Sequence, residues 1–332
     1  MKQKRVLAAA TREKALVHTR RHAAIYALLA LVVGAVVLVG LAAPARATYP
    51  GSNDGRLAFG VDLEPTGVLP QIYSILPNGE DFRQLTDSVG QNICPAYSAD
   101  GKEIAFCSNR TGSFEIWKMK QNGTQQMQVT HLAEFATFPD FSPDGRTIVF
   151  ASPAPGSPVQ SPPDIWAIDS DGHGAPVRLT DNPAMDGLPA YSPDGSKIAF
   201  VSARSGIPQV LVMNADGSDP VPLTFDSAPK GQLPDWSPDG SKIAYQASIA
   251  GNGDIYVMNA DGSDQRQLTH TTQTEFGTAW SPDGSQIAFV RVLGPTNVDR
   301  AIYVMNADGT GEHFLHQGSR VPAWQPRGNR ID

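Results

Sequence analysis

A nine-residue pattern recurs through this chain and constrains its fold more than any other feature. Its clearest copy runs from Ser237 to Tyr245 and reads Ser-Pro-Asp-Gly-Ser-Lys-Ile-Ala-Tyr. Related copies begin at Ser98, Ser142, Ser192 and Ser281, so that successive copies are separated by 44 to 50 residues. A period in this range is typical of repeat folds, in which each repeat forms one supersecondary unit.

The pattern has the chemistry of a tight turn between two strands. Pro restricts φ at the second position, Asp suits the third, and Gly readily adopts the left-handed conformation that follows. Apolar residues flank the turn on both sides, which predicts a β-hairpin in each copy. In the clearest copy, Gly240 is the residue expected to have a positive φ.

Each repeat contains four strand-like segments. The first ends in an aromatic residue just before the turn, and the second is the Ile-Ala-Phe run after it. The third is represented by Ile255-Tyr256, and the fourth ends in a pair such as Leu268-Thr269. Each segment occurs six times. The aromatic residues of the first segments, which we expect to fill the spaces between repeats, are Tyr97, Phe141, Tyr191, Trp236, Trp280 and Trp324.

The two ends of the repeat region complement each other. A partial copy at Asn53 lacks a first segment, whereas Pro322-Ala323-Trp324 has no segments after it. Joining them completes one unit, as in a closed ring of blades. We therefore expect an all-β fold after an N-terminal apolar helix. It is a six-bladed β-propeller of four-stranded antiparallel blades, closed by a C-terminal strand that completes the first blade.

The N-terminal region differs in composition from the repeats. Residues 1–22 are basic, and residues 23–47 contain an uncharged apolar run followed by Ala45-Arg46-Ala47. This arrangement predicts either a cleaved signal peptide or a single transmembrane helix. Both alternatives place the propeller, residues 48–332, outside the cytoplasm, in the periplasm or the extracellular space. Membrane contact is expected only through this helix, if it is uncleaved.

Charge argues against one class of partner. Residues 48–332 contain 18 basic and 32 acidic residues, a net charge of −14. Binding to a phosphate backbone depends on basic patches, so we expect no nucleic-acid partner.

The repeat unit resembles that of the TolB family. The resemblance rests on Ser-Pro-Asp-Gly-x-x-Ile-Ala-Phe, then Ile-Tyr-x-Met-Asn-x-Asp-Gly, then Leu-Thr, and it covers roughly residues 52–332. It concerns the propeller part only, and we expect the α/β domain that precedes the propeller in TolB to be absent. The resemblance implies a six-bladed propeller that acts in the cell envelope by binding another protein.

Sequence motifs for serine-hydrolase, zinc-protease and nucleotide-phosphate chemistry are missing. The chain contains no Gly-x-Ser-x-Gly, no His-Glu-x-x-His and no phosphate-binding Gly-x-x-x-x-Gly-Lys. We therefore expect no cofactor and no metal. Cys94 and Cys107 flank one hairpin turn, and they form either a disulfide or a buried thiol pair, depending on the strand register.

The loops that enter each first strand are expected to surround the mouth of the central channel. They carry charged residues and two Phe at equivalent places, which is a plausible composition for a recognition surface. The candidate binding residues are Glu134, Phe135, Asp186, Lys230, Glu275, Phe276 and Arg320.

Two functions are compatible with such a surface. We expect a non-catalytic binding module of the cell envelope whose partner is an envelope protein or a cell-wall component. The alternative is a hydrolase or lyase acting on carbohydrate or peptide at the channel. In that case Glu134 would form an acid/base pair with Asp186 or Glu275.

Overall fold

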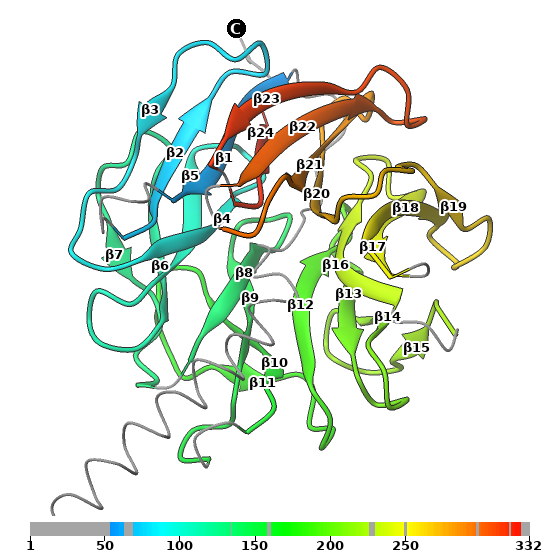
Figure 1. The fold of residues 1–332 in the computed structure, drawn as a ribbon. Helices are drawn as coiled ribbons and strands as arrows, with labels where there is room; N and C mark the ends of the chain where they lie inside the picture. Colours follow the sequence, from blue (N-terminus) through cyan, green and yellow to red (C-terminus); the bar gives the residue numbers. More distant parts are fainter. Residues whose placement is uncertain are drawn as a thin grey trace, which may run out of the picture. The chain divides into compact units, whose positions relative to one another are not determined.

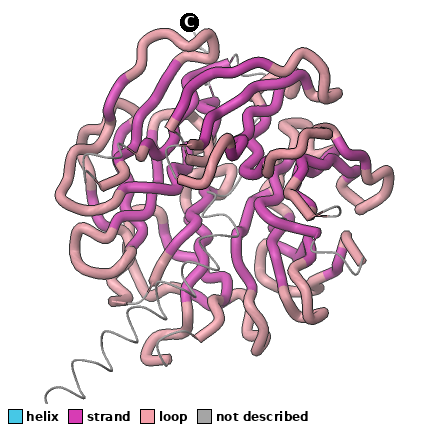
Figure 2. The backbone as a smooth tube through the Cα atoms, in the orientation of Figure 1, coloured by secondary structure: helices cyan, strands magenta, loops and turns pink. Residues whose placement is uncertain are grey.

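The computed structural model describes residues 54–62, 69–133, 135–157, 161–225, 230–248, 251–296, 299–318 and 320–326, without the side chains of residues 54 and 230–232. Within these residues, 24 strands form six four-stranded antiparallel sheets. Figure 1 shows the sheets as blades around a common centre. Figure 2 shows strands joined by loops, and the described residues contain no helix. The predicted six-bladed all-β propeller is confirmed.

The first blade combines strands from both ends of the described chain, and each other blade is a continuous run of four strands. From the centre outwards, the first three blades contain β24 (Ala323–Pro326), β1 (Asp54–Val61), β2 (Gln71–Ile75) and β3 (Arg83–Gln84); β4 (Asn92–Tyr97), β5 (Glu103–Ser108), β6 (Glu115–Lys120) and β7 (Met127–Gln128); and β8 (Thr137–Phe141), β9 (Thr147–Ser152), β10 (Asp164–Asp169) and β11 (Val177–Arg178).

The other three blades have the same plan. They contain β12 (Asp186–Tyr191), β13 (Lys197–Ser202), β14 (Gln209–Asn214) and β15 (Val221–Pro222); β16 (Lys230–Trp236), β17 (Lys242–Ala247), β18 (Asp254–Asn259) and β19 (Arg266–Gln267); and β20 (Glu275–Trp280), β21 (Gln286–Val292), β22 (Arg300–Asn306) and β23 (His313–Gln317). In the first five blades the outermost strand is only two residues long, shorter than the sequence suggests, because it ends just before the Leu-Thr pair or its equivalent.

The Ser-Pro-Asp-Gly turn is held by its own side chains. The Ser237 hydroxyl donates to Asp239 Oδ1 at 2.6 Å, and the same oxygen accepts the N–H of Ser241 at 3.0 Å. Gly240 has a φ of +69°, as its place in the turn predicts. Because these bonds are local, each copy of the sequence builds the same hairpin.

The Leu-Thr ending ties the outer strand to the third strand. In the first five blades the threonine Oγ1 accepts the backbone N–H of the first Ile or Val in the third strand. Between Ile255 and Thr269 this distance is 2.9 Å. The hydroxyl satisfies a buried donor at a point where a two-residue strand cannot continue the ladder.

Neighbouring blades pack through apolar faces and specific hydrogen bonds. All six aromatic residues at the ends of the inner strands are buried, which confirms their predicted place in the core. Two buried aspartates add bonds between blades. Asp140 Oδ2 accepts the N–H of Tyr191 at 2.8 Å, and Asp235 Oδ2 accepts that of Trp280 at 2.7 Å. Each bond fixes one inner strand against the next.

A feature that the sequence does not indicate recurs in the inner strands. Their pairing with the second strand shifts register at a β-bulge. Three residues before the terminal aromatic, the backbone has a positive φ in five blades, at Cys94, Phe138, Leu188, Leu233 and Gly277. Bulges commonly include a left-handed residue and bend the strand. Four of these five residues are not glycine, so the bulge leaves no obvious mark in the sequence.

The predicted N-terminal helix, whether signal peptide or transmembrane segment, lies outside the described residues. Among the residues that are described, no helix has the length and apolar character needed to span a membrane.

The turn assignment makes a stability prediction. Gly240→Val forces a β-branched side chain into a positive φ, so we expect it to lower the free energy of unfolding by about 1–3 kcal/mol. An added Cβ would meet no atom closer than 3.7 Å, so the cost comes from the backbone and not from a clash. Urea denaturation measures it.

Gly240→Asn is the matched control, because Asn adopts the left-handed conformation more readily than a β-branched residue. We expect its unfolding midpoint to lie between those of the wild type and Gly240→Val. Equal midpoints for all three proteins would contradict a left-handed residue in this turn.

Candidate functional site

The direction of the strands places two sets of loops on one face of the ring. The inner strands begin there, and so do the third strands, whereas the Ser-Pro-Asp-Gly turns lie at the opposite face. We call these the mouth face and the turn face. The loops that enter the inner strands, which carry the candidate binding residues, therefore belong to the mouth face.

Two of the candidate residues are buried and paired with arginine. Asp186 and Glu275, each the first residue of an inner strand, are 0% exposed. Asp186 Oδ2 accepts a hydrogen bond from Arg204 at 2.9 Å, and Glu275 Oε1 accepts one from Arg291 at 2.8 Å. They lie in different blades and in different ion pairs. Glu134, the third carboxylate of the predicted acid/base pairs, lies outside the described residues.

The two phenylalanines do not occupy equivalent places, so that expectation was wrong. Phe276 lies within β20 opposite Val290 and is only 3% exposed. Phe135 precedes β8 and is 39% exposed, with its ring edge-on to Phe114 at a centroid distance of 5.3 Å. Phe135 stands six residues before Phe141, whereas Phe276 stands four residues before Trp280, so only Phe276 falls within the inner strand. Phe276 is a core residue, and Phe135 remains accessible.

The last two candidates are Lys230 and Arg320. Lys230 begins β16, and its side chain is not described. Arg320 is 8% exposed, and its guanidinium donates two hydrogen bonds of 2.8 Å to the carboxylate of Asp62, just after β1. Arg320 therefore joins the last segment of the described chain to the first blade.

A backbone hydrogen bond recurs at four blade junctions on the mouth face. The backbone N–H at the start of an inner strand donates to a backbone carbonyl of the preceding blade. That carbonyl belongs to the residue directly before the third strand. This bond brings together the first side chain of the inner strand and the first side chain of that third strand. At one junction these are Asn92 and Gln71, whose amides form a hydrogen bond of 2.8 Å.

At two of these junctions both side chains are carboxylates. The pairs are Asp164 with Asp186, and Asp254 with Glu275, and all four side chains are at most 3% exposed. The Oδ1 atoms of Asp164, Asp186 and Asp254 have no hydrogen-bond partner among the described residues. Burial raises the pKa of Asp254 to about 6, and the nearby charge of Glu275 adds to this rise. Burial also raises the pKa of Asp164, although its hydrogen bond with Arg178 opposes the rise.

The pair of Asp254 and Glu275 is suited to holding a proton within the fold. Two adjacent buried carboxylates avoid repulsion when one of them is protonated, and the raised pKa of Asp254 favours its protonated form. A catalytic acid must also reach its substrate. Both side chains are enclosed, and Arg291, Thr269 and Thr271 already donate to Glu275. We therefore interpret the pair as a structural element of the junction.

The sequence analysis missed Asp164 and Asp254, although a signal for them exists. The residue directly before the first Ile or Val of the third strand is polar in five successive repeats, namely Gln71, Glu115, Asp164, Gln209 and Asp254. Aligning the repeats position by position identifies this as a position that is polar although it starts a buried strand.

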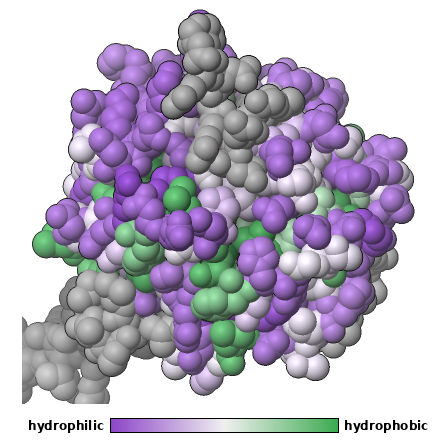
Figure 3. All heavy atoms as spheres, turned by 90° about the horizontal axis from the view of Figure 1, so that it is seen from above, coloured by the Kyte–Doolittle hydropathy of each residue, from purple (hydrophilic) through white to green (hydrophobic). Residues whose placement is uncertain are grey.

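The mouth face also exposes apolar side chains. Among the described residues, five large ones stand in its loops: Val89 (90% exposed), Phe225 (77%), Leu69 (41%), Leu293 (40%) and Phe135 (39%). Only Phe135 was among the predicted binding residues. Figure 3 shows, on the side that it presents, apolar side chains in separate patches within a mainly hydrophilic surface. Exposed apolar patches that are rimmed by polar residues are typical of docking surfaces.

The two cysteines are both buried free thiols, one of the two predicted alternatives. Cys107 pairs with Ile93, so Cys94 falls in the β-bulge, one position away from direct pairing. Burial, followed by the hydrogen bond between the two thiols, raises the pKa of Cys107.

The carboxyl pair predicts how stability varies with pH. The folded-state pKa of Asp254, about 6, exceeds that of an unfolded aspartate. Its contribution to stability is therefore complete below about pH 4 and is lost as the pH rises through 6. Asp254→Asn keeps an N–H donor toward Glu275 and does not titrate. We expect the variant to gain stability relative to the wild type between pH 4.5 and 7.5, as measured by urea denaturation at both values.

Asp194→Asn is a control, because the pKa of Asp194 is shifted in the opposite direction from that of Asp254. Hydrogen bonds from the Ser192 hydroxyl and the Ser196 N–H lower the pKa of Asp194, so its contribution is present near neutral pH and is lost in acid. Relative to the wild type, this variant should gain stability as the pH falls below about 4 and should change little between pH 4.5 and 7.5. An Asp254→Asn difference that does not vary with pH would contradict a raised pKa at the junction.

Comparisons with known proteins agree with this architecture. The chain is 30% identical over 146 residues to a TolB homolog of Chlorobium luteolum, covering 43% of this chain and 31% of that protein. It is 31% identical over 161 residues to the Tol-Pal system protein TolB of Bordetella pertussis, covering 45% and 36%. The matched stretches thus span about a third of the length of these relatives.

Structure and family comparisons cover more of the chain. The crystal structure of TolB from Acinetobacter baumannii matches with a TM-score of 0.72 at 25% identity, over 84% of this chain and 68% of that one. The profile of the TolB beta propeller domain matches residues 50–158, 125–233 and 228–332. The repeats, the six blades and these overlapping matches lead to one conclusion: this chain belongs to the TolB β-propeller domain family.

Proposed function

We propose that this protein is an exported, non-catalytic binding module of the cell envelope, and that its mouth face recognises an envelope protein. The observation that carries the proposal is the set of five exposed apolar side chains in the loops of the mouth face, of which Phe135 and Phe225 are aromatic. Aromatic side chains are frequent energetic anchors of protein interfaces. The name of one relative, Tol-Pal system protein TolB, supports a role in an envelope assembly and an exported location.

The charged candidates have a supporting role in this proposal. Asp186 and Glu275 fix the starts of the inner strands through Arg204 and Arg291, so they hold the loops that present the apolar residues. Removing a buried partner of such an ion pair is costly for the fold. The buried carboxylates thus favour binding over hydrolase or lyase chemistry, which needs acids that contact a substrate.

The proposal predicts that Phe135→Ala with Phe225→Ala strongly reduces capture of the envelope partner. Both side chains are exposed, so we expect the melting temperature to remain within about 2 °C of that of the wild type. Capture is measured by passing envelope extract over the immobilised full chain and quantifying the proteins that the wild type retains.

Val177→Ala with Val221→Ala is the matched control, because these exposed side chains lie on the outermost strands β11 and β15. We expect full capture by this variant. Equal capture by all three proteins would place the binding site away from the mouth face. Cleavage of an envelope glycan or peptide by the wild type would instead favour the enzymatic alternative.

We further propose that the pairing of β24 with β1 closes the ring in solution. The register aligns Leu57 with Trp324 and Ala58 with Ala323. Trp324 is fully buried, and the two hydrogen bonds between Arg320 and Asp62 lie beside this pairing. The contacts connect residues that are more than 250 positions apart in the chain.

Removing residues 318–332 should therefore expose an unpaired sheet edge and an apolar cavity. We expect aggregation or a drop in melting temperature of about 10 °C or more. Removing residues 327–332 alone leaves β24 in place and should have little effect. If both truncated proteins melt like the wild type, β24 does not close the ring.

A further inference from the structure

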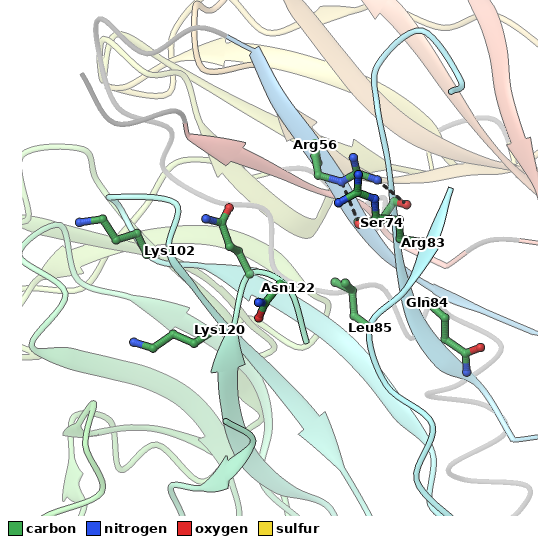
Figure 4. Close-up of a pocket in the computed structure, with 9 residues that line it drawn as sticks. Arg56, Ser74, Arg83, Gln84, Leu85, Lys102, Lys120 and Asn122 are labelled. Carbon is green, nitrogen blue, oxygen red and sulfur yellow. Dashed lines mark hydrogen bonds between the residues drawn. The ribbon is translucent and has the colours of Figure 1, made fainter. Parts of the chain in front are cut away.

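A groove lies between the first and second blades, near the turn face. It has a volume of about 570 Å³. Its lining includes four basic side chains, Arg56, Arg83, Lys102 and Lys120, and the amides of Gln84, Gln121 and Asn122. Figure 4 shows Arg56 and Arg83 on the wall formed by the first blade, and Lys102 and Lys120 on the wall formed by the second.

An equivalent groove between the fourth and fifth blades shows which properties belong to the fold. Its volume is about 560 Å³. Lys197 occupies the position of Arg56, one residue before the apolar run of the second strand, and Asp261 occupies that of Asn122. The charged residues of this second groove are Asp194, Asp239, Asp261 and Lys197. The ring therefore produces the groove at both junctions, whereas the basic lining is particular to the first.

The basic groove keeps a positive balance after its ion pairs are counted. Asp81 pairs with both Arg56 and Arg83. Glu103 pairs with both Lys118 and Lys120, and Asp100 pairs with Lys102. The four cations that line the groove thus face three carboxylates, one of which Lys118 also neutralises. Residues 48–332 have a net charge of −14, so the groove is a locally positive part of an acidic domain.

Three of the four cationic side chains that line the groove are accessible to an incoming anion. The side chains of Arg83, Lys102 and Lys120 are 62%, 72% and 44% exposed, so their ion pairs are weak and exchangeable in water. Lysine and arginine side chains in this setting attract carboxylates or phosphates at long range and hold them by charge-assisted hydrogen bonds.

Asp81 indicates which anion the groove accommodates. Its carboxylate receives hydrogen bonds of 2.7 Å from both Arg56 Nη1 and Arg83 Nε. The hydrogen bonds from Arg83 and Arg56 lower the pKa of Asp81. The guanidinium pair therefore already binds a carboxylate carried on a polypeptide. The amides of Gln84, Gln121 and Asn122 add donors and acceptors of the kind that a peptide backbone requires.

We propose that this groove is a second binding site, and that it accepts an acidic segment of a partner protein. The site lies near the turn face, so it is independent of the proposed mouth-face interaction. Carboxylates of the segment bind the arginines and lysines of the two walls, and its backbone meets the amides between them.

The test uses the full chain and a fluorescently labelled hexaglutamate peptide, with binding followed by anisotropy at about 20 mM salt, where screening is weak. We expect saturable binding that Lys102→Gln with Lys120→Gln weakens about tenfold. A hexaglutamine peptide should not bind. Failure of hexaglutamate to bind the wild-type protein would overturn the proposal.

Lys197→Gln is the matched control, because it removes a cation from the equivalent groove of the fourth and fifth blades. Its affinity for hexaglutamate should stay within about twofold of that of the wild type, since Lys197 does not line the basic groove. If Lys197→Gln loses as much affinity for hexaglutamate as the double variant, the binding reflects general charge attraction and the proposed site is wrong.

Vesicles containing phosphatidylglycerol, and inorganic phosphate, separate a peptide site from a phosphate site. We expect neither to displace hexaglutamate at equal charge concentration. Displacement by either would assign the groove to a phosphate-bearing ligand instead. The mouth-face variant Phe135→Ala with Phe225→Ala should bind hexaglutamate as the wild type does, so the two proposals fail or succeed separately.

Discussion

The central strands of each blade are buried on both faces, and this constraint governs the whole structure. A sheet with two apolar faces is unstable in water unless another sheet covers each side. Six such sheets satisfy one another only when they are arranged in a ring. The aromatic residue of each inner strand fills the space between blades, and Asp140 and Asp235 bind the next inner strand through its backbone. The ring and the closing role proposed for β24 follow from this requirement. So does the burial of the first side chains of the inner strands on the mouth face.

Much of the fold could be predicted because its determinants are local and repeated. The hydrogen bonds of the turn at Asp239 involve residues within two positions, so the sequence of the turn is sufficient to identify it. Trp236, Trp280 and Trp324 are large apolar side chains at fixed positions, and burial is the expected result for each. Repetition then multiplies the signal: a pattern too weak to assign one strand becomes strong when it occurs six times.

The candidate site was harder to predict, because its side chains are positioned by contacts between distant segments. A bulge at Leu188 or Leu233 places a non-glycine residue in the left-handed region, which no local propensity suggests. The bulges set the register of the inner strands, and with it the burial of Glu275 and Phe276. From the sequence, a charged residue in a loop looks solvent-exposed. In the structure, Glu275 and Arg320 are enclosed by partners that the ring supplies.

The two-residue outermost strands have a consequence for how this molecule meets others. A long exposed sheet edge offers a row of free backbone groups to which any extended chain can attach. Five of the six described blades end in an edge too short for such attachment, and β23 alone reaches five residues. Association by shared backbone hydrogen bonds is thereby suppressed around most of the circumference. The choice of binding partner therefore depends on side chains of the mouth face and the turn face. The loops on these two faces can vary in each repeat without changing the strands.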